Sequence, residues 1–270
     1  MIDERDVWAH IGEVMDPELD QPLDKLGFVE SVEIQGADVV VNFRLPTYWC
    51  APNFAYMMTA DLRERVARVP GVETVTIRLR DHFAEDEITD GVNAGRPFSQ
   101  TFAGEADGEL DELRMTFLRK AFLVRQEQLL RALLRAGYTP EQLVRLTASD
   151  IQVQGDALLT REVRDQGGPG DAADAGWRHI PHAARTFALY RQKRAAAGLD
   201  MAAAGPLFTT AEGEPLTPES VPQVLRAART IRLNGAFNTI LCTALNRVTH
   251  GVDVDADALC EETVERHTAG

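Results

Sequence analysis

One cysteine stands where its chemistry would be enhanced. Cys50 lies in the segment 47–53, two residues before Pro52, and a helical pattern begins at that proline. Proline is favoured at the first position of a helix, so we expect the Cys50 sulfur beside unsatisfied amide groups and the positive end of a helix dipole. That placement favours the thiolate, the form that binds metals and attacks electrophiles. The alternative is a buried, inert cysteine that packs as a small hydrophobic residue.

The elements that would position Cys50 form a compact α+β pattern. Apolar residues at helical spacing, and alternating apolar residues in between, predict in order a helix, two strands, a helix and a strand at 5–15, 28–34, 39–45, 54–66 and 72–79. Asp16-Pro17 ends the first helix, because the residue before proline is pushed out of the helical region. The order α-β-β-α-β is complete by about Phe83, so we expect a small N-terminal domain over residues 1–85.

The remainder of the chain has a different pattern. Residues 86–109 are rich in Gly, Asp, Asn and Thr, which indicates a linker. A mainly helical domain with a short β-hairpin is expected over residues 110–270. Its predicted elements are a long helix at 110–136, hairpin strands at 151–153 and 157–160 with a third strand at 178–180, and helices at 183–197, 219–231, 235–249 and 255–266. The overall fold class is therefore predicted to be α+β.

Composition excludes several classes of function. The chain has 270 residues, a length that favours two domains, and a formal net charge of −14, which disfavours binding of nucleic acid phosphates. Three cysteines, Cys50, Cys242 and Cys260, lie far apart, which indicates a reducing compartment without disulfides. The N-terminus lacks the pattern of a signal peptide, and no stretch is apolar enough to span a membrane. A cytoplasmic protein is expected.

Four motifs occur in a fixed order around Cys50. They are Asp16-Pro17-Glu18-Leu19, then Leu26-Gly27-Phe28-Val29, then the segment from Thr47 to Pro52, and finally Pro70-Gly71-Val72 before the strand Val75 to Leu79. This set resembles the PaaD/SufT-like iron–sulfur cluster assembly family over residues 7–83. Most members have proline directly after the cysteine, whereas Ala51 precedes Pro52 in this chain.

The resemblance implies a maturation factor for iron–sulfur or other iron enzymes rather than an enzyme. By this resemblance, Cys50 handles a transient iron ion or cluster, or docks the client. Asp16 and Glu18 are nearby family positions that would serve as metal ligands. Thr47 and Pro52 complete the functional loop. A cluster usually takes four thiolates, so a homodimer, a ligand other than a thiol, or the client must supply the rest. Asp16 and Glu18 are equally expected to accept hydrogen bonds from backbone amides.

The expected partners are a client metalloenzyme or a cluster carrier. Because PaaD-like domains are associated with phenylacetyl-CoA oxygenation, an alternative is a dedicated assembly factor or chaperone of a multicomponent diiron monooxygenase. On either alternative the C-terminal half would recognise a partner.

The C-terminal half carries a weaker resemblance. Residues 113–228 resemble the catalytic domain of tyrosine recombinases, but Thr139 replaces the first catalytic arginine and Tyr190 is the last tyrosine in the chain. The half is therefore predicted to be inactive and to bind a partner. A DNA-binding regulator is a third function class, which the acidic charge disfavours.

Two sets of side chains suggest zinc binding only superficially. One is the pair His179 and His182, and the other is the set Cys242, His250, Cys260 and His267. Neither contains a Cys-x-x-Cys knuckle, so ordinary core or surface positions are favoured over a zinc site.

Overall fold

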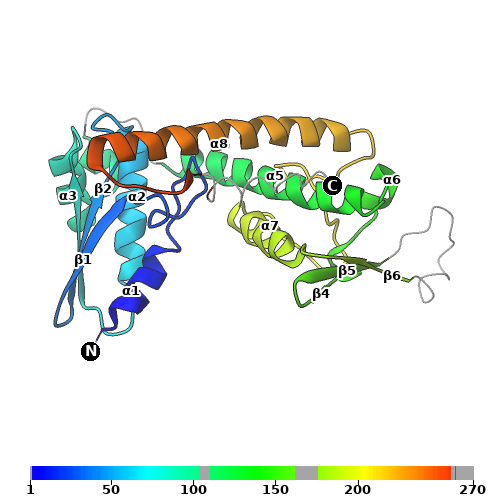
Figure 1. Cartoon of the computed structure of the whole chain (residues 1–270), viewed down its shortest axis with the longest axis horizontal. Helices are drawn as coiled ribbons and strands as arrows, with labels where there is room; N and C mark the ends of the chain where they lie inside the picture. The colour runs from blue at the N-terminus through cyan, green and yellow to red at the C-terminus, as the bar shows by residue number, and fades with distance from the viewer. Residues whose placement is uncertain (1, 104–109, 162–175, 257–258, 260–270) are drawn as a thin grey trace. The chain divides into compact units, whose positions relative to one another are not determined.

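The chain, drawn in Figure 1, folds into two units. Each unit has its own hydrophobic core. The structure is a computed structural model that describes residues 2–103, 110–161, 176–256 and 259. Unit 1 comprises Met1–Arg114 and Asn234–Gly270, and unit 2 comprises Met115–Leu233. Helices and two three-stranded sheets confirm the predicted α+β class. Among the described residues, no helix combines the length and the apolar character that crossing a bilayer requires.

Unit 1 is built on a sheet of three strands in the order β1-β2-β3, with β1 at Val29–Gln35, β2 at Asp38–Arg44 and β3 at Thr74–Arg80. Strand β1 pairs antiparallel to β2 through a tight turn at Gly36. Strand β3 runs parallel to β2, since a helix connects them. Alternation along the strands directs one face to the core. The buried side chains of that face are Val29, Val39, Val41, Phe43, Ile77 and Leu79.

Two helices cover the apolar face of this sheet. Helix α1 spans Glu4–Ile11 and helix α2 spans Pro52–Val66, and both contribute buried side chains to the core of unit 1. Helix α1 ends before the expected residue 15, with Gly12 as its C-terminal cap. Helix α2 begins at the proline that the sequence predicted as its first residue. The predicted order α-β-β-α-β is present in the structure.

Two further helices occupy the segment that was expected to be a linker. Helix α3 spans Glu85–Asn93 and helix α4 spans Phe98–Thr101, and both belong to unit 1. The Asn93 side chain accepts from the Ile77 amide (2.9 Å) and donates to the Ile77 carbonyl (2.7 Å), so α3 covers the open edge of β3. The expected linker is wrong for this segment, because α3 has too few apolar residues to give a helical pattern in the sequence. Of those few, Ile88 and Val92 are buried. Residues 104–109 lie outside the described residues.

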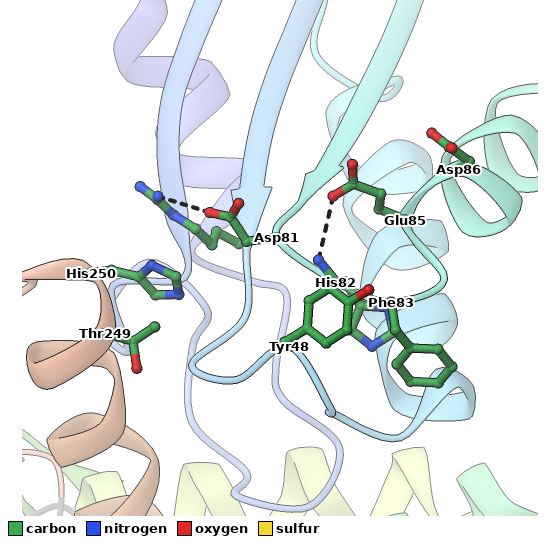
Figure 2. A pocket seen from close by; sticks show the side chains of 9 residues that line it. Tyr48, Asp81, His82, Phe83, Glu85, Asp86, Thr249 and His250 are labelled. Atoms are coloured by element: carbon green, nitrogen blue, oxygen red, sulfur yellow. Dashed lines mark hydrogen bonds and ion pairs between the residues drawn. The ribbon is translucent and has the colours of Figure 1, made fainter.

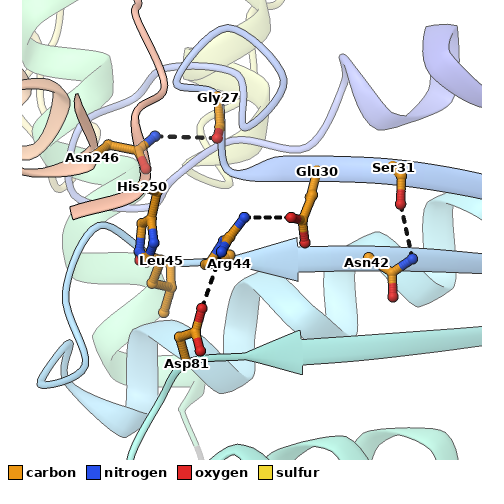
Figure 3. A network of polar contacts seen from close by, with 9 residues as sticks. All are labelled: Gly27, Glu30, Ser31, Asn42, Arg44, Leu45, Asp81, Asn246 and His250. Carbon is orange, nitrogen blue, oxygen red and sulfur yellow. Dashed lines mark hydrogen bonds and ion pairs between the residues drawn. The ribbon is translucent and has the colours of Figure 1, made fainter. Parts of the chain in front are cut away.

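The C-terminal end of a long helix completes unit 1. Helix α8 runs without interruption over Val221–His250. Separate helices were expected at 219–231 and 235–249, but Gly235 lies within the one helix and does not end it. The part from Asn234 onward belongs to unit 1 rather than to a separate domain over 110–270. In this part the Asn246 side-chain Nδ2 donates to the Leu26 carbonyl (3.1 Å). It also donates to the Gly27 carbonyl (3.2 Å), as Figure 3 shows. The helix expected at 255–266 lies largely outside the described residues.

Gly27 is a position that requires glycine. Its φ is +68°, and a Cβ atom there would lie 2.6 Å from the Val252 side chain. The residues after α8 therefore pack against the segment that leads into β1.

Unit 2 combines helices with the predicted hairpin. Strands β4 and β5 form that hairpin and β6 adds a third strand, as expected. The ranges of the elements are α5 Asp111–Arg135, α6 Pro140–Leu143, η1 Ala148–Asp150, β4 Ile151–Gln154, β5 Ala157–Arg161, β6 Trp177–Ile180 and α7 Ala184–Ala196. The first part of α8 completes the unit.

Two buried polar side chains in unit 2 bond to the backbone. Gln126 donates to the Thr209 carbonyl (2.8 Å) and accepts from the Thr209 amide (3.1 Å). The Arg194 guanidinium donates to the carbonyls of Leu207 (2.7 Å) and Asp200 (3.0 Å) and to the Tyr190 hydroxyl (2.7 Å). These bonds compensate the cost of burying polar groups.

Candidate functional site

Cys50 lies in the loop that joins β2 to α2, as the sequence predicted. Ala51 is the N-terminal cap of α2 and Pro52 lies in its first turn. The Cys50 amide donates to the Thr47 carbonyl at 3.4 Å, so the backbone of Thr47 closes the turn that carries the cysteine. The extra residue between cysteine and proline therefore still leaves Cys50 at the start of the helix.

A buried histidine holds this loop in place. The His82 Nδ1 accepts from the Ala84 amide (3.2 Å), so its Nε2 carries the proton and donates to the Cys50 carbonyl (2.7 Å). Burial lowers the pKa of His82, which favours this neutral form. Sequence reasoning missed His82 because it follows β3 and is far from Cys50 in the chain.

The Cys50 thiol differs from the thiolate that its position suggested. Burial raises the pKa of the Cys50 thiol to about 12, and the negative charge of Asp16 adds to the shift. A hydrogen bond from the Ala51 backbone lowers the pKa of Cys50, but its effect is smaller. The backbone at the start of the helix therefore lowers the pKa of Cys50, as expected, but the loss of solvent raises that pKa by more. Cys50 is consequently a protonated thiol at neutral pH.

Asp16 caps the backbone beside this thiol. Its Oδ1 accepts from the amides of Glu18 and Leu19, both at 2.8 Å, which is the capping arrangement that the sequence left open. The side chain is buried, and burial raises the pKa of the Asp16 carboxyl to about 6. Glu18 points to α8, where its Oε1 accepts a hydrogen bond from the side-chain Nδ2 of Asn238 at 3.2 Å.

A second thiol lies near enough to Cys50 to raise its pKa. Cys242 lies on α8 between Asn238 and Asn246, one turn from each, and both asparagines bond to the N-terminal segment. Burial raises the pKa of Cys242 to about 11, and the charges of Asp16 and Glu18 add to the shift. Cys242 in turn raises the pKa of Cys50, so the two thiols are close enough to interact electrostatically.

Nothing in the sequence pairs these two cysteines. The available signal was a stripe of polar residues at helical spacing on α8, namely Asn238, Thr239, Cys242, Thr243 and Asn246. Such a stripe on a helix indicates polar contacts, but it does not show which residues make them.

The predicted metal ligands do not form a complete site. Among the residues that the structure describes, no group of three or more His, Cys, Asp or Glu side chains is arranged to hold a metal ion. The residues considered for zinc are also separated. His182 forms an ion pair with Asp156 at 2.6 Å, and the His250 Nε2 bonds to the Leu45 carbonyl at 3.0 Å. Cys260 and His267 lie outside the described residues.

A pocket of about 650 Å³ opens near the Cys50 loop (Figure 2). It lies at the ends of β2 and β3 and at the last turn of α8. Arg44 is part of its lining and pairs with Asp81 at 3.1 Å and with Glu30 (Figure 3). The full lining consists of Arg44, Tyr48, Asp81, His82, Phe83, Glu85, Asp86, Thr249 and His250. The pocket belongs entirely to unit 1.

Comparison with known proteins identifies one region. Residues 4–77 match the family model described as iron-sulfur cluster assembly protein. The match includes Asp16, Glu18 and Cys50 but not His82 or Cys242. No curated protein matches the chain. The N-terminal region is thus similar to that family, which supports a general role in iron–sulfur cluster assembly or maturation. The recombinase-like interpretation of the C-terminal half stays a prediction.

Proposed function

We propose that this protein is an accessory, non-catalytic factor in the maturation of iron–sulfur or other iron enzymes, and that it handles iron or a cluster through Cys50. The observation that carries the proposal is the position of Cys50, which lies inside the matched region and close enough to Asp16 and Cys242 for both to raise its pKa. Thiols and carboxylates are ligands that iron accepts in proteins. The iron ion or cluster is cargo in this function.

The raised pKa values of these groups suit a transient cargo. Because the pKa values of Cys50 and Cys242 are raised to about 12 and about 11, both thiols are protonated before a metal arrives. Metal binding must release those protons, so affinity rises with pH. A bound cation would also stabilise the buried Asp16 carboxylate. We therefore expect weak, reversible binding rather than a permanent site.

The ligand count requires a second molecule. A cluster usually takes four thiolates, and Cys50 with Cys242 supplies two. The remaining ligands would come from the client, from a cluster carrier or from a second copy of this chain. This requirement agrees with a factor that transfers its cargo.

Anaerobic reconstitution of the full chain with ferrous iron and sulfide tests the proposal. The visible absorbance of a cluster should appear in the wild type and be lost in Cys50→Ser. Cys242→Ser should reduce it, and Cys260→Ser serves as the matched control that should retain it. A wild type that is as colourless as Cys50→Ser would reject direct handling of a cluster.

A narrower function is that of an assembly factor or chaperone for a multicomponent diiron monooxygenase. This function would be supported if the iron content of an oxygenase subunit falls when the gene for this protein is removed. The Cys50→Ser gene should then fail to restore the iron content, whereas Cys260→Ser should restore it. An unchanged iron content in the deletion strain would exclude this client.

A further inference from the structure

Three large aromatic side chains are exposed beside the Cys50 loop. Tyr48, Trp49 and Phe83 are 50%, 75% and 43% exposed. Their rings contact one another, with ring centroids 4.9 Å apart for Tyr48 and Trp49 and 5.6 Å apart for Trp49 and Phe83. Large rings that cluster in contact with water are typical of protein interaction sites, in which tryptophan and tyrosine are enriched.

This cluster is attached to the backbone of the candidate site. The Phe83 amide donates to the Tyr48 carbonyl at 3.2 Å, and the neighbouring His82 donates to the Cys50 carbonyl at 2.7 Å. The loop that carries the thiol and the loop that carries Phe83 are therefore linked by two hydrogen bonds. A partner bound to the rings would lie next to Cys50.

The charge of the adjacent pocket is negative. Its lining contains the carboxylates of Asp81, Glu85 and Asp86, and Arg44 is the single lysine or arginine in that lining. Arg44 is already paired with Asp81 and with Glu30. Glu85 and Asp86 lie in the first turn of α3, and the chain as a whole carries a formal charge of −14. The complementary ligand is a cation.

We propose that Tyr48, Trp49, Phe83, Glu85 and Asp86 form a docking surface for an arginine-bearing segment of a partner protein. A guanidinium group stacks on aromatic faces and pairs with carboxylates through two parallel hydrogen bonds, so arginine fits rings beside carboxylates better than lysine does. The inference rests on the proposed function, because the docked segment would present client groups to Cys50. The carboxylates disfavour nucleic acid and anionic lipid surfaces.

The test uses the full chain and two short fluorescent peptides. One peptide consists of arginine, glycine and serine, and the other has citrulline in place of arginine, which keeps the shape and removes the charge. Fluorescence anisotropy at low salt should show that the arginine peptide binds and that the citrulline peptide binds at least about fivefold more weakly. Trp49→Ala and the double variant Glu85→Gln/Asp86→Asn should each weaken binding about three- to tenfold.

Matched controls separate the docking surface from general acidity. Glu87→Gln removes a charge from the same turn of α3 outside the pocket lining, and Trp177→Ala removes an exposed tryptophan from unit 2. Both should bind the arginine peptide as the wild type does. Equal affinity for the two peptides, or unchanged binding by Trp49→Ala, would overturn the inference. So would a wild-type dimer that Trp49→Ala converts to a monomer, because the surface would then be a self-interface.

Failure here is distinguishable from failure of the proposed function. Trp49→Ala and Glu85→Gln/Asp86→Asn should keep the wild-type absorbance after reconstitution with iron and sulfide, since Cys50 and Cys242 are unchanged. If that absorbance depends on Cys50 but the peptides bind alike, only the docking inference fails. If the peptides are discriminated but no absorbance forms, the docking surface stands and cluster handling fails.

Discussion

Two buried side chains of unit 2, Arg194 and Gln126, are held by hydrogen bonds to the backbone, whereas the Cys50 region of unit 1 combines two partly buried thiols with three exposed aromatic rings. Arg194 and Gln126 each bond to backbone carbonyls inside the core of unit 2. In unit 1, two thiols lie near the buried Asp16 carboxyl, and three aromatic rings face the solvent.

The difference indicates where side chains are available to a ligand or partner. A buried group whose hydrogen bonds are satisfied contributes to the fold and is not available to a ligand. A thiol whose charged form is disfavoured by burial can still be ionised by an incoming cation, and an exposed ring can still be covered by a partner. Unit 2 is therefore expected to respond to mutation mainly through stability, and the Cys50 region mainly through binding.

The largest expected effect is the loss of Arg194 in unit 2. Arg194→Met removes the bonds to Leu207, Asp200 and Tyr190, so the Leu207 carbonyl keeps the Tyr190 hydroxyl as its donor but the buried network loses its charged member. We expect the free energy of unfolding to fall by about 3 kcal/mol. Urea unfolding followed by circular dichroism measures it, with Arg191→Met on the exposed side of the same helix as the control. A loss no larger than that of the control would show that these bonds are dispensable.

The next effect is a pH-dependent stability that comes from Asp16. Its pKa is raised by burial from 3.8 to about 6, so the native state binds more protons than the unfolded state between about pH 4 and pH 6. This carboxyl therefore lowers stability as pH rises through that window, by about 3 kcal/mol in total.

Asp16→Asn should remove this dependence, since its amide oxygen can still accept from the Glu18 and Leu19 amides. The variant should be more stable than the wild type near pH 7 and similar to it near pH 4, as measured by urea unfolding. Asp86→Asn, at an exposed position, is the control. A difference between wild type and Asp16→Asn that is the same at both pH values would contradict the assigned cause.

The smallest effect is on the reactivity of the Cys50 thiol. In the variant Cys242→Ser/Cys260→Ser, Cys50 is the sole cysteine, and its pKa is raised mainly by burial. Alkylation by iodoacetamide near pH 8 should be at least about thirtyfold slower than for free cysteine or for the same variant in urea, because the loss of thiolate outweighs its higher nucleophilicity. A rate equal to or above that of free cysteine would restore the activated thiolate suggested by the helix N-terminus.

Much of the N-terminal fold could be predicted from local patterns. The α-β-β-α-β order and the start of α2 at Pro52 follow from apolar periodicity and from proline chemistry, which act over a few residues. Helix α3 was missed because Ile88 and Val92 are too few to form a periodic signal. The continuity of α8 through Gly235 was missed because packing can override the low helix propensity of glycine.

The candidate site was predicted only in part. Cys50, Asp16 and Glu18 were identified from their motifs, and Cys50 as the functional thiol stays a prediction. His82 and Cys242 were not identified, since each reaches the site from a distant part of the chain.

The sequence by itself determined the α+β class, the order of elements around Cys50 and the place of this cysteine at the start of a helix, because these depend on short-range preferences. Only the tertiary structure decided that Cys50 is a partly buried, protonated thiol whose pKa is also raised by Cys242. Desolvation and the proximity of distant residues depend on how the whole unit packs, and no local pattern encodes them.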